Sequence, residues 1–273
     1  EMVALRDLLA TLGSSRIESR QDGALFDTGE SANWLFNTGL AGIETADAIL
    51  LVGTNPRQEA ALLNVRLRKA VKKGGAKAYN IGPAADLSFP IAQLGDDAAL
   101  LGNLPADVIA AFANAQRPAI IVGMGALKTP GLYAAVRAAA AQLGVVKDGW
   151  NGFNLVHTAA ARAGALRLGL AVEGGVNALL GDTGIKALFL LGADEVNVMS
   201  GRFTVYIGTH GDHGVRHADV ILPAAAYTEK PGTYVNMEGR VQRALKATQP
   251  PGDAREDWTI LRALSSVLGQ KLP

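Results

Sequence analysis

Short, continuous apolar runs recur along the chain, and each is closed by a residue that ends a strand. Four of the runs end in glycine and the fifth ends in proline. Unbroken rather than alternating hydrophobicity is typical of strands that are covered on both faces of a sheet. The pattern therefore predicts five buried parallel strands: AILLVG (48–53), PAIIVG (118–123), ALFLLG (187–192), FTVYIG (203–208) and ADVILP (218–223).

Helical patterns lie between these runs. Asn55 is suited to cap a helix whose first residue is Pro56, and this helix is expected to end at Gly74-Gly75. Strands and helices in series, joined by glycine turns, predict a doubly wound α/β fold. Further helical patterns cover residues 1–13, 105–116, 131–143 and 257–268, and His157 is expected to be an isolated histidine on a helix.

Two similar stretches indicate that the fold has two related halves. ADAILLVGTNP (46–56) and KALFLLGADEV (186–196) each read as a strand that ends in a glycine turn. The helical pattern over 105–116 stops before Arg117-Pro118, which favours a boundary near residue 116. We therefore predict two doubly wound, mainly parallel, Rossmann-like halves, over 1–116 and over 117–273 with a C-terminal helix.

Composition narrows the classes of function. The 273 residues suffice for one large or two smaller α/β domains. With 26 basic and 25 acidic residues, the charge gives no strong case for nucleic acid or an anionic membrane surface. No apolar run reaches about 18–20 residues, so no membrane-spanning helix is expected.

The chain contains no cysteine. Iron–sulfur clusters are held mainly by cysteine thiolates, so this sequence cannot hold one in that way. A cysteine nucleophile is excluded as well, and no serine–histidine–aspartate arrangement is evident. The sequence starts with Glu1 in a helix-like segment and shows no secretory signal, which fits a piece of a longer protein or a processed natural start.

The turn Gly53-Thr54-Asn55-Pro56 is a candidate anion site. It presents backbone amides at a helix N-terminus directly after a buried strand, and such amides bind phosphate. The alternative is that Asn55 only caps its helix, which contributes about 1 kcal/mol. The matching turn after residue 191 contains Gly192 and Asp194. Asp194 could accept hydrogen bonds from a ribose or a guanine base, or could cap the next segment.

Two further motifs carry weaker signals. GMGALK (123–128) has two of the three glycines of a dinucleotide fingerprint, with Lys128 in place of the third. THGDHGVRH (209–217) holds three of the four histidines, at spacings that could bind zinc. Gly211 and Gly214 disfavour a regular helix there, so a polar loop at the carboxyl edge of the sheet is the favoured interpretation.

The segment after the last predicted strand is densely polar. Pro223 ends the strand, Pro231-Gly232 suit the centre of a type II turn, TYVN can form a short strand and Gly239 another turn. The polar side chains would then line the carboxyl edge of the sheet, where doubly wound folds bind ligands. The alternative is a hairpin that satisfies its own hydrogen bonds, with Glu–Arg pairs. The candidate residues are Glu229, Thr233, Asn236, Glu238, Arg240 and Gln242.

Several long motifs resemble one known superfamily. ADVILPAAAYTEKPGTYVNMEGRVQ (218–242), ADAILLVGTNPRQEAALLNVRLRKA (46–70) and KALFLLGADE (186–195) resemble the molybdopterin oxidoreductases. DGWNGFNLVHTAAARAGALRLG (148–169) and PPGDAREDWTILRALSSVLG (250–269) are similar to the complex I branch, the large iron–sulfur subunits of NADH:quinone oxidoreductases. The resemblance covers essentially the whole chain.

The resemblance implies a subunit that relays electrons from NADH through iron–sulfur clusters towards quinone. The clusters are expected in an N-terminal ferredoxin-like region that this sequence does not contain. The cofactor-facing loops of the family correspond to residues 53–56, to Gly192 and Asp194, and to residues 229–242. We expect these loops to be remnants of a pterin–guanine dinucleotide cleft, with no catalytic residue, metal or other cofactor in this region.

The resemblance also implies partners and a place in the cell. The expected partners are other peripheral-arm subunits and the protein's own ferredoxin-like region, without nucleic acid or direct membrane insertion. The expected location is the cytoplasmic face of a bacterial inner membrane, or the mitochondrial matrix. A structural scaffold is thus the main hypothesis. The alternatives are a module of a molybdopterin-dependent enzyme such as a formate dehydrogenase, and a free nucleotide-binding domain that uses the turn at 53–56.

Overall fold

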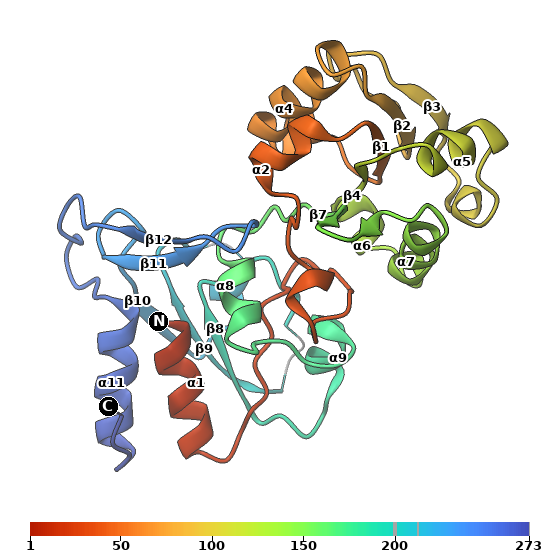
Figure 1. Ribbon diagram of the computed structural model, residues 1–273. Coiled ribbons are helices and arrows are strands. Elements are labelled where there is room, and N and C mark those ends of the chain that lie inside the picture. Colours follow the sequence, from red (N-terminus) through yellow and green to blue (C-terminus); the bar gives the residue numbers. More distant parts are fainter. Residues whose placement is uncertain (199–200, 212, 273) are drawn as a thin grey trace. The chain divides into compact units, whose positions relative to one another are not determined.

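The computed structural model describes residues 1–198, 201–211 and 213–272. The chain forms two compact units (Figure 1). The central unit comprises Ala24–Ala163 and Val235–Arg240. The terminal unit comprises Glu1–Gly23, Gly164–Tyr234 and Val241–Pro273, and so contains both ends of the chain.

The central unit is built on one five-stranded sheet in the order β3-β2-β1-β4-β7, in which all neighbouring strands are parallel. The strand order reverses between β1 and β4, as in a doubly wound fold. All residues of these two strands are apolar and buried, because helices cover both faces of the sheet. The strands are β1 (Ala48–Val52), β2 (Lys77–Ile81), β3 (Ala92–Gly95), β4 (Pro118–Val122) and β7 (Phe153–Leu155).

Successive residues of β1 point to opposite faces of this sheet. Ile49 and Leu51 pack with helix α4 in one core cluster. Leu50 is aligned with Tyr79, whose ring lies 6.3 Å from that of Phe112 on α5, so α5 covers the other face. The helices of this unit are η1 (Ser31–Asn33), α2 (Gly39–Gly42), η2 (Ile43–Thr45), α3 (Pro56–Glu59), α4 (Ala61–Lys72), η3 (Ala98–Gly102), α5 (Ala106–Ala113), α6 (Met124–Leu127) and α7 (Leu132–Gln142), and a small hairpin joins β5 (Val146–Lys147) to β6 (Trp150–Asn151).

The terminal unit contains a three-stranded parallel sheet in the order β10-β9-β8. Helices α1 and α11 lie side by side on one face of it, where Leu8 and Leu261 pack against Ile207 (Figure 1). Val176 of α9 packs with Leu190 in a separate cluster, on the other face. The elements are α1 (Met2–Thr11), α8 (Arg162–Arg167), α9 (Gly175–Gly181), β8 (Ala187–Leu191), β9 (Phe203–Gly208), α10 (His213–Arg216), β10 (Val220–Pro223), the hairpin β11 (Gly232–Val235) and β12 (Val241–Ala244), and α11 (Asp257–Val267).

All five predicted strands are present, as β1, β4, β8, β9 and β10. Three local predictions were wrong. The helix expected from Pro56 to Gly74 is broken at Ala60, whose φ of −153° is not helical. Gly232 lies in β11 and has no positive φ, whereas a type II turn requires one at that position. His157 follows β7 outside any helix, because the apolar run before it pairs with β4 as a strand.

The compact units do not follow the predicted division into 1–116 and 117–273. Residues on both sides of position 116 share one sheet, since β4 pairs with β1 along its whole length. The carboxylate of Asp47 also accepts the backbone N–H groups of Gln116 (2.7 Å) and Arg117 (2.9 Å). The chain instead leaves the central unit after Ala163 and returns to it for Val235–Arg240.

The helices of both units are short in comparison with the thickness of a bilayer. Helix α4, for example, has 12 residues, whereas a membrane-spanning helix needs about 20. None of the helices in ranges 1–198, 201–211 and 213–272 is long and apolar enough to cross a bilayer.

Candidate functional site

The predicted turn Gly53-Thr54-Asn55-Pro56 lies at the carboxyl end of β1, where the strand order of the central sheet reverses. This position is the usual ligand crevice of a doubly wound fold. Gly53 has a φ of +57°, which a residue with a side chain rarely adopts. Its N–H donates to the carbonyl of Ile81 at 2.9 Å. The turn therefore lies where the sequence predicted it.

The neighbouring turn after β4 closes this crevice. The N–H of Gly125 donates to the carbonyl of Gly53 at 2.9 Å. A Cβ atom added to Gly53 would lie 2.4 Å from the nitrogen of Ala126, and one added to Gly123 would lie 2.3 Å from the Cβ of Thr54. The two turns thus touch backbone to backbone. The glycines of the GMGALK motif serve this contact, because a side chain at Gly123 would overlap the turn after β1.

Glu59 occupies the hydrogen-bond donors that an anion would use. One carboxylate oxygen accepts the backbone N–H of Asn55 at 2.7 Å, and the other accepts the hydroxyl of Thr54 at 3.1 Å. A phosphate at a helix N-terminus would make the same two interactions. The side chain of Asn55, predicted to cap the helix, makes no capping hydrogen bond. Glu59 was missed in the sequence, although a carboxylate four residues after the cap position was a visible signal.

Asn236, Glu238 and Arg240 lie in the turn of the β11–β12 hairpin, within the central unit. The Asn236 side-chain oxygen accepts the N–H groups of Glu238 (3.1 Å) and Arg240 (2.9 Å). Glu238 also accepts the N–H of Leu40, and the carbonyl of Met237 accepts the N–H of Phe36 at 2.8 Å. The Arg240 guanidinium is exposed and lies 4.0 Å from Glu238. The contacts of Asn236 stay within the hairpin, as in the alternative interpretation, whereas Glu238 and Met237 also bond to Leu40 and Phe36 of the central unit.

The second predicted turn, with Gly192 and Asp194, follows β8 in the terminal unit. Gly192 has a φ of +58°, close to the +57° of Gly53, but no described helix lies between β8 and β9, so the predicted βα turn is not found here. Asp194 accepts the N–H of Gly214 in α10 at 2.6 Å. Asp194 therefore holds the start of α10, which comes after β9 in the chain and is not the segment that directly follows Asp194. No described atom lies within 4 Å of a Cβ added to Gly192, so this turn is open where the first is closed.

The remaining predicted residues also belong to the terminal unit. Glu229 accepts the N–H of Ala226 at 2.9 Å and so closes its own turn. Thr233 and Gln242 are exposed on the hairpin strands. The structure therefore divides the predicted residues between the two units, and within the central unit no described hydrogen bond joins residues 53–56 to Asn236, Glu238 or Arg240.

Lys230 is a buried charge in the polar segment that the sequence did not single out. Its ammonium group contacts Glu1 at 2.9 Å and also pairs with Asp257. Burial by itself lowers the pKa of Lys230, but the hydrogen bonds to Asp257 and Glu1 outweigh burial and raise the pKa above that of a free lysine. Lys230 thereby joins the starts of α1 and α11. Both partners are distant in sequence, so no local pattern could have indicated this cluster.

The histidine-rich segment follows β9 and was predicted to be a loop, but its second part forms helix α10, which contains Gly214. The carbonyl of His210 accepts the hydroxyl of Tyr206, and the ring of His210 lies 2.9 Å from the hydroxyl of Thr209. In the part of the chain that the structure describes, no three His, Cys, Asp or Glu side chains gather as metal ligands would. Asp212 lies outside the described residues.

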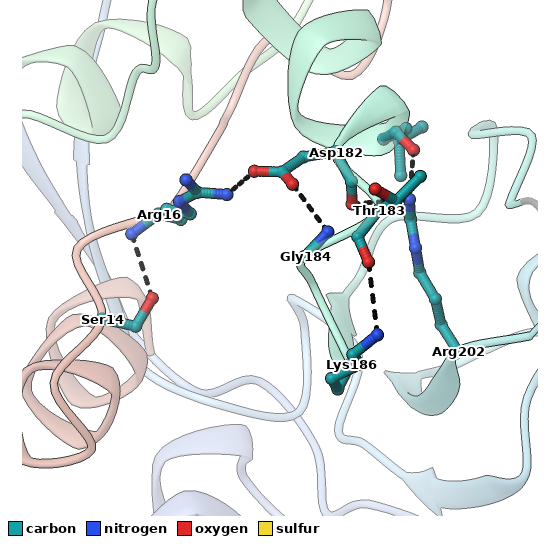
Figure 2. A network of polar contacts seen from close by, with 8 residues as sticks. Ser14, Arg16, Asp182, Thr183, Gly184, Lys186 and Arg202 are labelled. Carbon is teal, nitrogen blue, oxygen red and sulfur yellow. Dashed lines mark hydrogen bonds and ion pairs between the residues drawn. The ribbon is translucent and has the colours of Figure 1, made fainter.

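A polar network lies at the opposite, amino-terminal end of the β8–β9 pair (Figure 2). Asp182 accepts the N–H of Gly184 at 2.8 Å and pairs with Arg16. Arg202 donates to the carbonyl of Asp182 at 2.9 Å, and Lys186 approaches the carbonyl of Thr183 at 3.5 Å. These bonds hold the loop between α9 and β8. The network lies away from the carboxyl ends of the strands, where α/β folds bind ligands.

The parallel sheets and glycine turns define a doubly wound α/β protein. A profile of the family described as Molybdopterin oxidoreductase matches residues 1–267, and the chain belongs to this family. The resemblance stated from the motifs is thus confirmed.

Relatives in three groups of organisms agree with the complex I branch. The chain is 44% identical, over 100% of its length, to the mitochondrial NADH-ubiquinone oxidoreductase 78 kDa subunit of Candida albicans. It is 43% identical, again over 100%, to the mitochondrial NADH dehydrogenase [ubiquinone] iron-sulfur protein 1 of Solanum tuberosum. It is 38% identical, over 98%, to an NADH-quinone oxidoreductase subunit of Rickettsia typhi. The chain spans 38%, 38% and 40% of these relatives.

Proposed function

We propose that this chain is a scaffold region of the large iron–sulfur subunit of an NADH:quinone oxidoreductase. The whole parent subunit would relay electrons from NADH through iron–sulfur clusters towards quinone. This region would contribute shape and contacts, and by itself would be inactive. The names of relatives that are 38–44% identical over nearly the whole chain support the parent complex.

The closed crevice between β1 and β4 carries the proposal. Gly125 bonds to Gly53, and the backbone of Ala126 approaches so closely that it would overlap a Cβ atom on Gly53. Glu59 adds a negative charge at the donors of the turn. The residues present therefore do not fit a pterin–guanine dinucleotide at this turn. A phosphate would have to displace a carboxylate of its own sign and separate two hydrogen-bonded turns.

The absence of cysteine supports the same assignment. With no thiolate in 273 residues, cysteine-held clusters would have to be carried by another part of the parent protein. The proposed partners are that part and other peripheral-arm subunits. The proposed location is the cytoplasmic face of a bacterial inner membrane, or the matrix of a mitochondrion; two of the relatives are named as mitochondrial.

A cofactor assay on the 273-residue protein tests the scaffold. We expect no stoichiometric molybdenum by elemental analysis and no fluorescent pterin after acid oxidation. Calorimetry with GDP and NADH should show dissociation constants in the millimolar range or no heat. Stoichiometric pterin would instead support the module of a molybdopterin enzyme, and micromolar GDP binding would support the free nucleotide-binding domain; either result overturns the scaffold.

A further inference from the structure

The outer face of α4 carries basic side chains and no acidic ones, which sets it apart from the balanced charge of the whole chain. Residues 60–85 contain six lysines and arginines and no acidic residue, although the whole chain has 26 basic and 25 acidic residues. Solvent-facing helices usually mix both signs of charge, because pairs at i, i+4 stabilise the helix. The basic residues of this segment are Arg66, Arg68, Lys69, Lys72, Lys73 and Lys77.

Helical spacing gathers these charges beside two exposed aliphatic side chains. Leu62, Val65, Lys69 and Lys72 follow the spacing i, i+3, i+7, i+10 and so lie on one stripe. Leu62 is 76% exposed and Val65 is 51% exposed. The opposite stripe, Leu63, Leu67 and Ala70, is buried in the core of the central unit. We call the exposed surface formed by Leu62, Val65, Arg68, Lys69, Lys72 and Lys73 the α4 stripe.

Only part of this positive charge is neutralised within the chain. Glu44 pairs with Arg66 and, at 3.0 Å, with Lys69. These hydrogen bonds, first that of Arg66 and then that of Lys69, hold the pKa of Glu44 below its usual value. No acidic side chain among the described residues pairs with Arg68, Lys72 or Lys73. The helix dipole favours lysines in the last turn, but it does not account for the exposed Leu62 and Val65.

We propose that the α4 stripe is a docking surface for an acidic face of another protein subunit, one that presents an apolar side chain between its carboxylates. Because the α4 stripe is positively charged, the matching surface of the partner must be negatively charged. Leu62 and Val65 provide the apolar anchor. A bilayer is a poorer fit, since Leu63 and Leu67 point into the core, and Leu62 and Val65 alone provide too little apolar surface to insert. This proposal rests on the proposed function, because it takes the partner from the same complex.

Zero-length cross-linking in the intact complex tests this surface. A carbodiimide joins lysine amines to carboxylates that are in contact, and Lys69 of α4 with Glu44 of η2, 3.0 Å apart, is a positive control within the same unit. We expect Lys72 and Lys73 to be joined to aspartate or glutamate residues of another subunit. If the control cross-link forms and these lysines are joined only to their own polypeptide, or to nothing, the proposal is overturned.

Charge reversal gives a second measurement. The double variant Lys72→Glu/Lys73→Glu in the full-length parent should enter the complex about tenfold less efficiently. The matched control is Lys271→Glu, a reversal at another exposed lysine, which should assemble normally. A urea unfolding midpoint equal to that of the wild type would show that the double variant folds. Normal assembly of the double variant overturns the proposal, as does binding of the stripe to phosphatidylglycerol vesicles but to no subunit.

Failure of the proposed function would be recognised separately. The parent protein would then sediment apart from NADH-oxidising activity. The same cross-linking on whichever assembly contains it would still decide whether the α4 stripe meets an acidic surface.

Discussion

At the scale of single residues, the contact between the turns after β1 and β4 depends on side chains that are absent. We expect Gly123→Ala to destabilise the central unit by about 3 kcal/mol, because the new Cβ would overlap Thr54, and overpacking forces the backbone to shift. Urea unfolding followed by circular dichroism measures this loss. Gly102→Ala is the control, since a Cβ there meets no described atom within 4 Å; equal losses in both variants would contradict a close approach of the two turns.

Glu59 is a second residue whose role can be measured. Glu59→Ala removes the carboxylate that accepts from Asn55 and Thr54, and we expect a loss of about 1 kcal/mol, as for other helix caps. Gln58→Ala, at the exposed neighbouring position, should change the stability little. Because the backbone of Ala126 still fills the crevice, Glu59→Ala should not gain binding of GDP in calorimetry. Such a gain would show that charge alone keeps the turn closed.

The raised pKa of Tyr133 leads us to expect that the stability depends on pH in the alkaline range. Burial, opposed by Arg137 and reinforced by Asp27, raises the pKa of its phenol to about 12 from 10.0. A proton is therefore held more tightly in the folded state, and the stability that this provides is complete below pH 10 and is lost as the pH rises to 12. Tyr133→Phe should lose less stability than the wild type over this range. Urea unfolding midpoints of the wild type and of Tyr133→Phe at pH 9, 10 and 11 measure this difference. If the two proteins lose stability in parallel as the pH rises, the phenol does not contribute.

Residue types predicted the positions of the candidate turns correctly, but they did not predict which atoms form hydrogen bonds with the residues of those turns. Gly53 and Gly192 could be found because a glycine at the end of an apolar run is a local pattern, although a helix follows only Gly53 among the described elements. The partners could not be found in this way, since Gly125 and Gly214 reach their turns through the tertiary fold. The dense polar segment similarly indicated a site, whereas most of its hydrogen bonds close its own hairpin.

At the scale of elements, strands with an uninterrupted apolar pattern were predicted correctly, and elements with a weaker pattern were missed. The five uninterrupted runs all form strands. Strand β2 was missed because its sequence, KAYNI, places Asn80 inside the sheet, where the amide bonds to Gln93 at 2.7 Å. The break at Ala60 was missed because alanine and its neighbours are good helix formers, and propensity gives no reason to interrupt the helix there.

Lys230 links two elements, and its removal should affect both. Lys230→Met would leave Asp257 buried without its cation, since only 5% of the Asp257 side chain is exposed. We expect a loss of about 3 kcal/mol, and a partial recovery in Lys230→Met/Asp257→Leu, because the apolar pair removes the unpaired charge. Thermal and urea unfolding measure both changes. Lys271→Met, at an exposed lysine, is the control, and an equal effect there would exclude a role for burial.

At the scale of the whole molecule, each of the two units has core clusters of its own, and the units are interleaved in sequence. The chain enters the central unit at Ala24, leaves it after Ala163, and returns only for Val235–Arg240. This short return contributes to the central core, since Met237 packs against the cluster that contains Ile49 and Leu51. A boundary drawn along the sequence could not describe this arrangement, because the hairpin strands and their turn belong to different units.

The returning turn should therefore stabilise one unit more than the other. Met237→Gly/Glu238→Gly removes the apolar contact and the bond from the Leu40 N–H, and we expect amide exchange in β1 and β4 to become at least about tenfold faster. Exchange in β9 should be nearly unchanged, because Ile207 and its neighbours pack in a cluster of the terminal unit. Hydrogen exchange read by peptide mass spectrometry separates the two. Arg240→Ala, an exposed residue of the same turn, is the control, and equal acceleration in β1 and β9 would mean that the units unfold as one.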